Sequence, residues 1–152
     1  MALIEHFLSS QGIRYRVLAH TKPVFTCEEA ALERKVPLGE MIKSILLVDK
    51  QKNYCLACLP ADKPLDPQSV RAITGMQRTS FASKEEIRQV LGYEMGAVSP
   101  LMIAGKIPIV FDETIAQKQK VNISSGNPTA GIELSASDLI KLVKPAIHKI
   151  TK

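Results

Sequence analysis

Met41-Ile42-Lys43-Ser44-Ile45-Leu46-Leu47-Val48 is the stretch that decides the fold, because it is apolar except for Lys43 and Ser44. Such a run is typical of a central strand that is buried on both faces. The polar segment 49–53 follows, and Tyr54–Leu59 is apolar again, so we expect a hairpin. A buried ammonium group is costly without a partner, so Lys43 either emerges at the strand end or faces a cleft.

The patterns on both sides of this hairpin indicate further helices and strands. Apolar periodicity and capping residues predict helices over Ala2–Gln11, from the Thr26 cap to about Lys35, from Asp66-Pro67 to Gly75, from Ser83 to Gly92, and from Ser135 or Ser137 through Leu142. Strands are expected over Ile13–Leu18, Met76–Phe81, Ile107–Phe111 and Val121–Ser124, and around Ile132 and Leu134. Because no regular β-α-β repeat is visible, we predict an α/β fold of the mixed α+β kind, with a mixed sheet and surrounding helices.

The composition fits one globular domain, residues 1–152. Hydrophobic residues make up 45% of the chain and charged residues 23%. The formal charge of +5 is compatible with a polyanionic partner, but 5% aromatic residues argue against a stacking platform for single-stranded nucleic acid. No apolar run approaches the roughly 20 residues that cross a bilayer, so we expect a cytoplasmic protein without membrane contact.

The stretch Gly96-Ala97-Val98-Ser99-Pro100 joins a flexible residue to a restrained one. Gly96 tolerates a positive φ, while Pro100 keeps Ser99 extended. We therefore expect the amides of Ala97 and Val98 to point outward, where they suit a phosphate, a carboxylate or an oxyanion. The alternative is a tight turn before a buried strand.

The remaining polar residues give weaker signals. His20 follows a predicted strand and is a candidate for a cleft wall. Cys55 and Cys58 have metal-like spacing, but in a strand their side chains point to opposite faces, so we expect reduced thiols and no metal. Gly126-Asn127-Pro128 is expected to form a hairpin turn. The sequence contains neither a G-x-x-x-x-G-K-[ST] or G-x-G-x-x-G nucleotide-binding motif nor the G-x-S-x-G motif of serine hydrolases. We expect no cofactor.

Several of these segments, in this order, resemble the YbaK/ProX family of aminoacyl-tRNA editing domains, which occur free or attached to prolyl-tRNA synthetase. The resemblance covers nearly the whole chain. It rests on the His20 loop with Thr26-Cys27-Glu28-Glu29-Ala30-Ala31, on 41–48, on Gly92-Tyr93 with 96–101, and on 121–126 with Ile132-Glu133-Leu134 and Ser137-Asp138-Leu139.

The resemblance implies a curved, barrel-like mixed sheet and metal-independent hydrolysis of a mischarged aminoacyl-tRNA, typically tRNA for proline. It implies that Lys43 lies in the active cleft and that the G-x-x-x-P loop holds the terminal aminoacyl-adenosine. On this basis Lys43, Ala97 and Val98 are the expected catalytic residues. The expected substrate-binding residues are His20, Gly96, Ser99, Pro100 and Gly126. Prolyl-tRNA synthetase is a further expected partner.

Two positions depart from the branch of the family that removes cysteine. That branch has an acidic residue where Gly131 stands here, and its cleft tyrosine lacks a clear counterpart near Leu18–Ala19. We therefore expect the substrate to carry a small misacylated amino acid, with alanine as the first candidate and cysteine or serine as the next. The sequence indicates no narrower choice, because a pocket distinguishes two amino acids that differ by one methylene by only about 1–3 kcal/mol. The alternatives are a non-catalytic module that binds a tRNA end or a synthetase, and a small-molecule binder.

Overall fold

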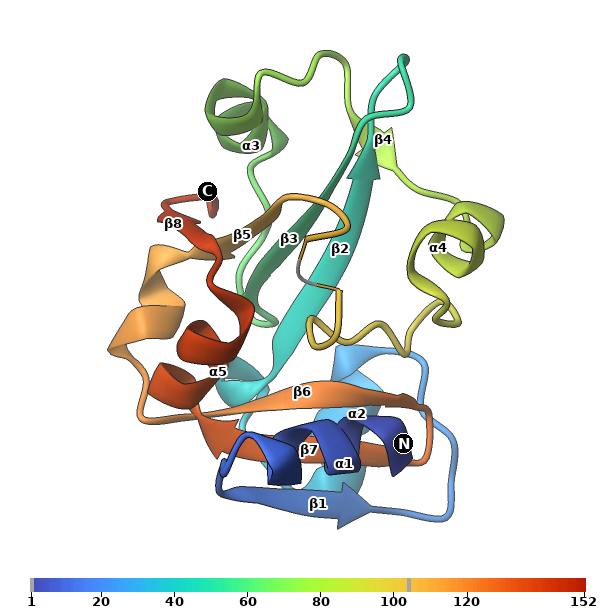
Figure 1. The fold of residues 1–152 in the computed structure, drawn as a ribbon, viewed down its shortest axis with the longest axis vertical. Coiled ribbons are helices and arrows are strands. Elements are labelled where there is room, and N and C mark those ends of the chain that lie inside the picture. The colour runs from blue at the N-terminus through green and yellow to red at the C-terminus, as the bar shows by residue number, and fades with distance from the viewer. Residues whose placement is uncertain (1, 104) are drawn as a thin grey trace.

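The computed structural model describes residues 2–103 and 105–152, so the first residue of the expected domain lies outside it, and its strands form two sheets (Figure 1). The larger sheet has the strand order β4-β2-β3-β5-β8, and the smaller sheet has the order β1-β7-β6. The strands of the larger sheet are β2 (Ile42–Val48), β3 (Tyr54–Pro60), β4 (Ser80–Phe81), β5 (Ile109–Asp112) and β8 (Ala146–His148). Those of the smaller sheet are β1 (Tyr15–Ala19), β6 (Lys120–Asn127) and β7 (Ala130–Ser135).

The hairpin of β2 and β3 is the centre of the larger sheet, as predicted. The two strands are antiparallel, with Lys43 opposite Leu59 and Val48 opposite Tyr54. Strand β5 joins β3 in parallel and β8 joins β5 in parallel, so the sheet is mixed. The predicted mixed α/β fold is therefore confirmed.

In the described residues, one isolated bridge joins the two sheets at the start of β2. Met41 pairs in parallel with Asn122 of β6, next to the point where β2 begins. The larger sheet ends at β4 and β8 and the smaller one at β1 and β6, so neither sheet closes on itself across the described residues. The expected barrel-like curvature is thus not confirmed.

The helices after the first begin next to capping residues that the sequence indicates. The helices are α1 (Ala2–Ser10), α2 (Cys27–Arg34), α3 (Pro67–Thr74), α4 (Lys84–Leu91) and α5 (Ala136–Val143), with short 3-10 turns η1 (Leu38–Glu40) and η2 (Glu113–Gln117). At α4, Ser83 and Glu86 form a complete capping box. For α5 the cap is Ser135, whose hydroxyl accepts a hydrogen bond from the Asp138 amide, and not Ser137.

The core lies mainly between the two sheets. Leu46 and Leu56 of the larger sheet belong to the same buried cluster as Ile123 and Ile132 of the smaller one. On the other face of the hairpin, Leu47 packs in a second cluster. The hairpin is therefore buried on both faces, as its apolar sequence requires.

Two strand predictions need correction. The strand expected over 76–81 is reduced to Ser80–Phe81, because Arg78 has a φ of +51° and interrupts an extended run. The strand expected over 107–111 begins at Ile109, after Pro108, whose carbonyl still accepts a hydrogen bond from the Leu56 amide. Strand β8 was not predicted.

Candidate active site

A cavity of about 170 Å³ lies where α2, the start of β2, the Gly96 loop and the β6–β7 turn meet. Its walls combine apolar side chains with two cations, a thiol, hydroxyl groups and an amide. The lining residues are Val24, Phe25, Thr26, Cys27, Ala30, Arg34, Met41, Ile42, Lys43, Ser44, Gly96, Val98, Ser124, Asn127 and Pro128. Three of the predicted site residues, Lys43, Gly96 and Val98, are therefore brought together.

Lys43 enters this cavity from the beginning of β2. Its side chain is half-buried, and no ion pair or hydrogen bond joins its ammonium group to another residue in the part of the chain that the structure describes. Burial raises the pKa of the Cys27 thiol, and the positive charge of Lys43 acts in the opposite direction and lowers it. An ammonium group in a half-buried wall is suited to meet an anionic or polar ligand.

The Gly96 loop uses its backbone freedom for packing inside the protein. Gly96 has a φ of +85°, and an added Cβ would lie 2.7 Å from the carbonyl oxygen of Phe25. The close approach that we expected for a ligand is thus taken by the Phe25 backbone, which leads into the cap of α2. Gly96 thereby fixes the loop against the wall of the cavity.

The two amides expected to face outward differ. The Ala97 N–H donates to the carbonyl of Glu94 at 3.0 Å, and the residue is only 1% exposed, so the expectation of a free Ala97 amide is wrong for this conformation. The Ala97 N–H is used within a turn of the loop and is not free to bind a ligand. The Val98 N–H has no hydrogen-bond acceptor among the described residues, which leaves it as the available donor of the pair.

The other three predicted residues of this region shape the loop and do not line the cavity. Ser99 is fully buried, and its hydroxyl accepts a hydrogen bond from the Leu101 amide at 3.3 Å. Pro100 lies in a separate depression beside α5. The ring of Tyr93 occupies the space that a Cβ at Gly126 would need, at 2.8 Å, and burial raises the pKa of Tyr93.

His20 lies behind the cavity wall. Its Nδ1 donates to the carbonyl of Lys22 at 2.8 Å, which leaves Nε2 as an acceptor toward Arg34 Nε at 3.5 Å. His20 does not line the cavity, and reaches it only through Arg34.

Sequence reasoning missed several lining residues, of which Arg34 and Cys27 are the most notable. Both belong to α2, where the sequence shows an ordinary capped helix with a basic last turn. Arg34 packs against Gly131 of β7, far away in the sequence. The glycine that interrupts the alternation in that strand was the available signal.

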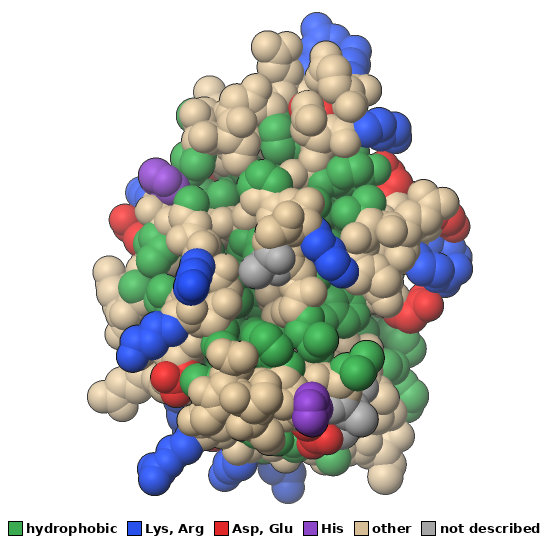
Figure 2. Space-filling model, in the orientation of Figure 1, with side chains coloured by type: hydrophobic (Ala, Val, Ile, Leu, Met, Phe, Trp, Pro, Cys, Tyr) green, Lys and Arg blue, Asp and Glu red, His purple; other side chains and the backbone are tan. Residues whose placement is uncertain are grey.

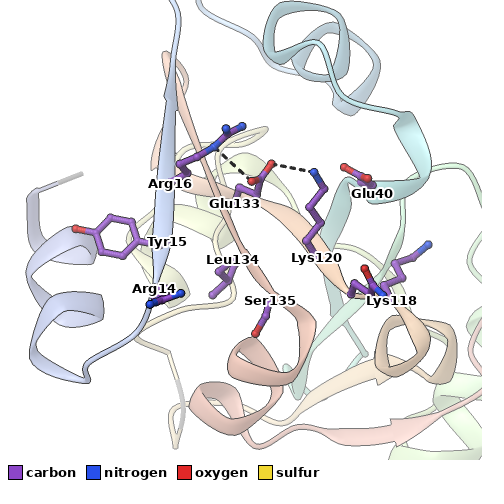
Figure 3. A pocket seen from close by; sticks show the side chains of 10 residues that line it. Arg14, Tyr15, Arg16, Glu40, Lys118, Lys120, Glu133, Leu134 and Ser135 are labelled. Atoms are coloured by element: carbon purple, nitrogen blue, oxygen red, sulfur yellow. Dashed lines mark ion pairs between the residues drawn. The ribbon is translucent and has the colours of Figure 1, made fainter.

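A larger open groove of about 600 Å³ contains none of the predicted residues (Figure 3). Its centre is Glu133, which pairs with Arg16 at 3.3 Å and with Lys120 at 3.9 Å. Lys and Arg side chains are scattered over the face shown in Figure 2 and along its rim, without one dominant patch. We therefore take the smaller cavity as the candidate site.

The described residues contain no group of three or more His, Cys, Asp or Glu side chains placed to hold a metal ion. None of the helices in 2–103 and 105–152 has the length and apolar character to cross a membrane. Cys58, one of the two buried thiols on β3, contacts the Ser44 hydroxyl at 3.4 Å, and burial raises its pKa to about 12.

The fold and the cavity define a mixed α/β domain with a half-buried site that carries two cations, Arg34 and Lys43. The profile of the aminoacyl-tRNA editing domain matches residues 21–142, and the chain belongs to this family.

Relatives extend over most of the chain. A protein named "Prolyl-tRNA editing protein ProX" from Acetoanaerobium sticklandii is 28% identical, covering 90% of this chain and 86% of the relative. One named "Multifunctional Ser/Thr-tRNA deacylase ProXp-y" from Escherichia coli K12 is 26% identical, covering 92% and 86%. The crystal structure of hypothetical protein APE2540 is 25% identical, with a TM-score of 0.88 over 98% of this chain and 99% of the other.

Proposed function

We propose that the protein is a trans-acting deacylase that hydrolyses the ester of a mischarged small amino acid on tRNA, with tRNA for proline as the main substrate. Alanine, cysteine and serine are the candidate amino acids. The proposal treats residues 1–152 as one editing domain that works in the cytoplasm, where tRNA is charged, with prolyl-tRNA synthetase as a further partner. Its support is the family membership and the names of the two relatives.

The reaction requires little covalent chemistry from the protein. A water molecule attacks the ester carbonyl carbon, the bond from that carbon to the ribose oxygen breaks, and the ribose oxygen takes up a proton. Negative charge develops on the carbonyl oxygen, and a fixed donor there typically lowers the barrier by about 3–4 kcal/mol. We assign this role to the Val98 amide and place the Lys43 ammonium group at the ribose or the terminal phosphate.

The observation that carries the proposal is that Lys43, without a partner among the described residues, shares one cavity with Gly96 and Val98. Ala97 keeps a supporting role, because its hydrogen bond to Glu94 orients the peptide that precedes Val98. Ser99, Pro100, Gly126 and His20 then act on the substrate through the shape of the loop and the wall.

The test is the replacement of Lys43 by alanine. We expect ester hydrolysis on mischarged tRNA for proline to fall at least about tenfold, because one charged group of the site is lost. Lys50→Ala, in the exposed hairpin loop, is the control and should keep full activity. Urea unfolding of both variants checks that the fold is intact.

Two results would contradict the proposal. Unchanged turnover of Lys43→Ala would remove Lys43 from the site. Tight, salt-sensitive binding of charged tRNA without ester loss in the unaltered protein would favour the alternative, a non-catalytic module that binds the tRNA end or a synthetase.

A further inference from the structure

The guanidinium group of Arg34 lies directly on the backbone of Gly131. A Cβ built on Gly131 would meet three guanidinium atoms of Arg34, with Nε at 2.6 Å. Gly131 lies within β7 and does not have a positive φ, so its backbone does not require a glycine. The missing side chain at position 131 therefore provides space for Arg34.

This guanidinium group has few partners inside the protein. Within the described part of the chain, its one hydrogen bond is the long contact from Nε to His20 Nε2, at 3.5 Å. Its Nη1 atom is buried without an acceptor among the described residues. Burial also lowers the pKa of Arg34. A half-buried cation with unmet donors is costly, and a ligand that brings an acceptor would remove part of that cost.

The charges around Arg34 also favour a ligand that brings an acceptor. The described residues that line the cavity include two cations, Arg34 and Lys43, and no Asp or Glu. Glu29 of the same helix is engaged elsewhere, since its Oε1 accepts a hydrogen bond from the Thr26 hydroxyl at 3.1 Å. The Arg34 end of the cavity is therefore a site for an oxygen acceptor.

We propose that Arg34 determines specificity by donating a hydrogen bond to an oxygen atom in the side chain of the misacylated amino acid. This inference rests on the proposed function, in which Val98 and Lys43 hold the ester and the ribose. Other lining residues, among them Arg34, Cys27, Ala30 and Met41, are then left for the amino acid side chain. Hydroxyl and carboxylate side chains satisfy Arg34, whereas the methyl group of alanine does not.

The expected preference follows from the hydrogen bond. A hydrogen bond to a charged donor corresponds to roughly 10- to 100-fold in an equilibrium or rate constant. Serine and threonine esters should therefore be removed at least about tenfold faster than alanine or cysteine esters on the same tRNA. Aspartyl esters are included to distinguish a carboxylate from a hydroxyl acceptor.

Two variants test this without relying on activity alone. Arg34→Met keeps the aliphatic stem and removes the donors, and Gly131→Ala displaces the guanidinium while leaving Arg34 in the chain. Both should reduce the preference for serine over alanine to about onefold, and the double variant should show no further change. Arg34→Lys should recover part of the preference, and Arg71→Met, on α3, is the matched control that should keep all of it.

The binding of non-hydrolysable probes separates the two proposals. The probes are 3′-deoxyadenosine analogues that carry a 3′-amide-linked seryl, aspartyl or alanyl group. Tighter binding of the seryl or aspartyl probe, lost in Arg34→Met, supports the inference even if no ester is hydrolysed, in which case only the proposed function fails. Equal affinity of the unaltered protein for all probes would overturn the inference about Arg34. An equal loss of affinity for the seryl and alanyl probes in Arg34→Met would overturn it as well.

Discussion

Replacing Gly96 by alanine tests whether the contact between the Gly96 loop and Phe25 holds the cavity in shape. Gly96 has a φ of +85°, and the new Cβ would lie 2.7 Å from the Phe25 carbonyl oxygen. A positive φ costs a non-glycine residue about 1–2 kcal/mol, and overpacking costs about 1–3 kcal/mol more. We therefore expect Gly96→Ala to lower the free energy of unfolding by about 2–5 kcal/mol.

Gly75→Ala is the matched control for this prediction. Gly75 has a φ of +76°, and a Cβ there would meet no heavy atom within 4 Å. This variant should lose only the conformational part, about 1–2 kcal/mol. Urea unfolding of both variants, followed by circular dichroism, measures the difference. Equal losses would refute the argument that the Phe25 backbone occupies the space beside Gly96.

The same pair of variants separates stability from activity. Phe25 precedes Thr26, the cap of α2, so a displaced Phe25 also displaces the cavity wall. We expect kcat/KM on mischarged tRNA to fall for Gly96→Ala at temperatures where the variant is folded. Gly75→Ala should keep the kcat/KM of the unaltered protein.

Two further predictions concern titratable groups away from the site. Hydrogen bonds, first from the Ser83 amide, lower the pKa of Glu86 from 4.5 to about 2, so its contribution to stability is present above pH 4.5 and is lost as the pH falls toward 2. Glu86→Gln should therefore weaken the acid dependence of the urea midpoint in this range, and an unchanged dependence would contradict the assignment. Burial raises the pKa of Cys55 to about 11 and of Cys58 to about 12, whereas Cys27 is only partly buried. A thiol reagent should therefore modify Cys27 first and the other two only on unfolding. Peptide mapping by mass spectrometry measures the order of modification.

Local chemistry explains which parts of the fold the sequence could predict. The caps of α2, α3 and α4 were found because the capping side chains and the amides they satisfy lie within three residues of each other. The β2–β3 hairpin was found because its apolar runs flank a short polar loop. Strand β8 was missed because its three residues are exposed, and its pairing depends on β5, which is far away in the sequence.

The site shows the same limit. Lys43 stood out as a charge in an apolar strand, and the Gly96 loop stood out by composition, and both reach the cavity. The bond from the Ala97 amide to Glu94 and the seat of Arg34 on Gly131 depend on turn geometry and on tertiary contact. A spacing rule contains neither kind of information.

The packing of Arg34 against Gly131 also couples these two positions during evolution. A side chain gained at position 131 displaces the guanidinium of residue 34, because the two cannot occupy the same volume. Positions 34 and 131 should therefore exchange as a pair when descendants of this chain acquire a new substrate.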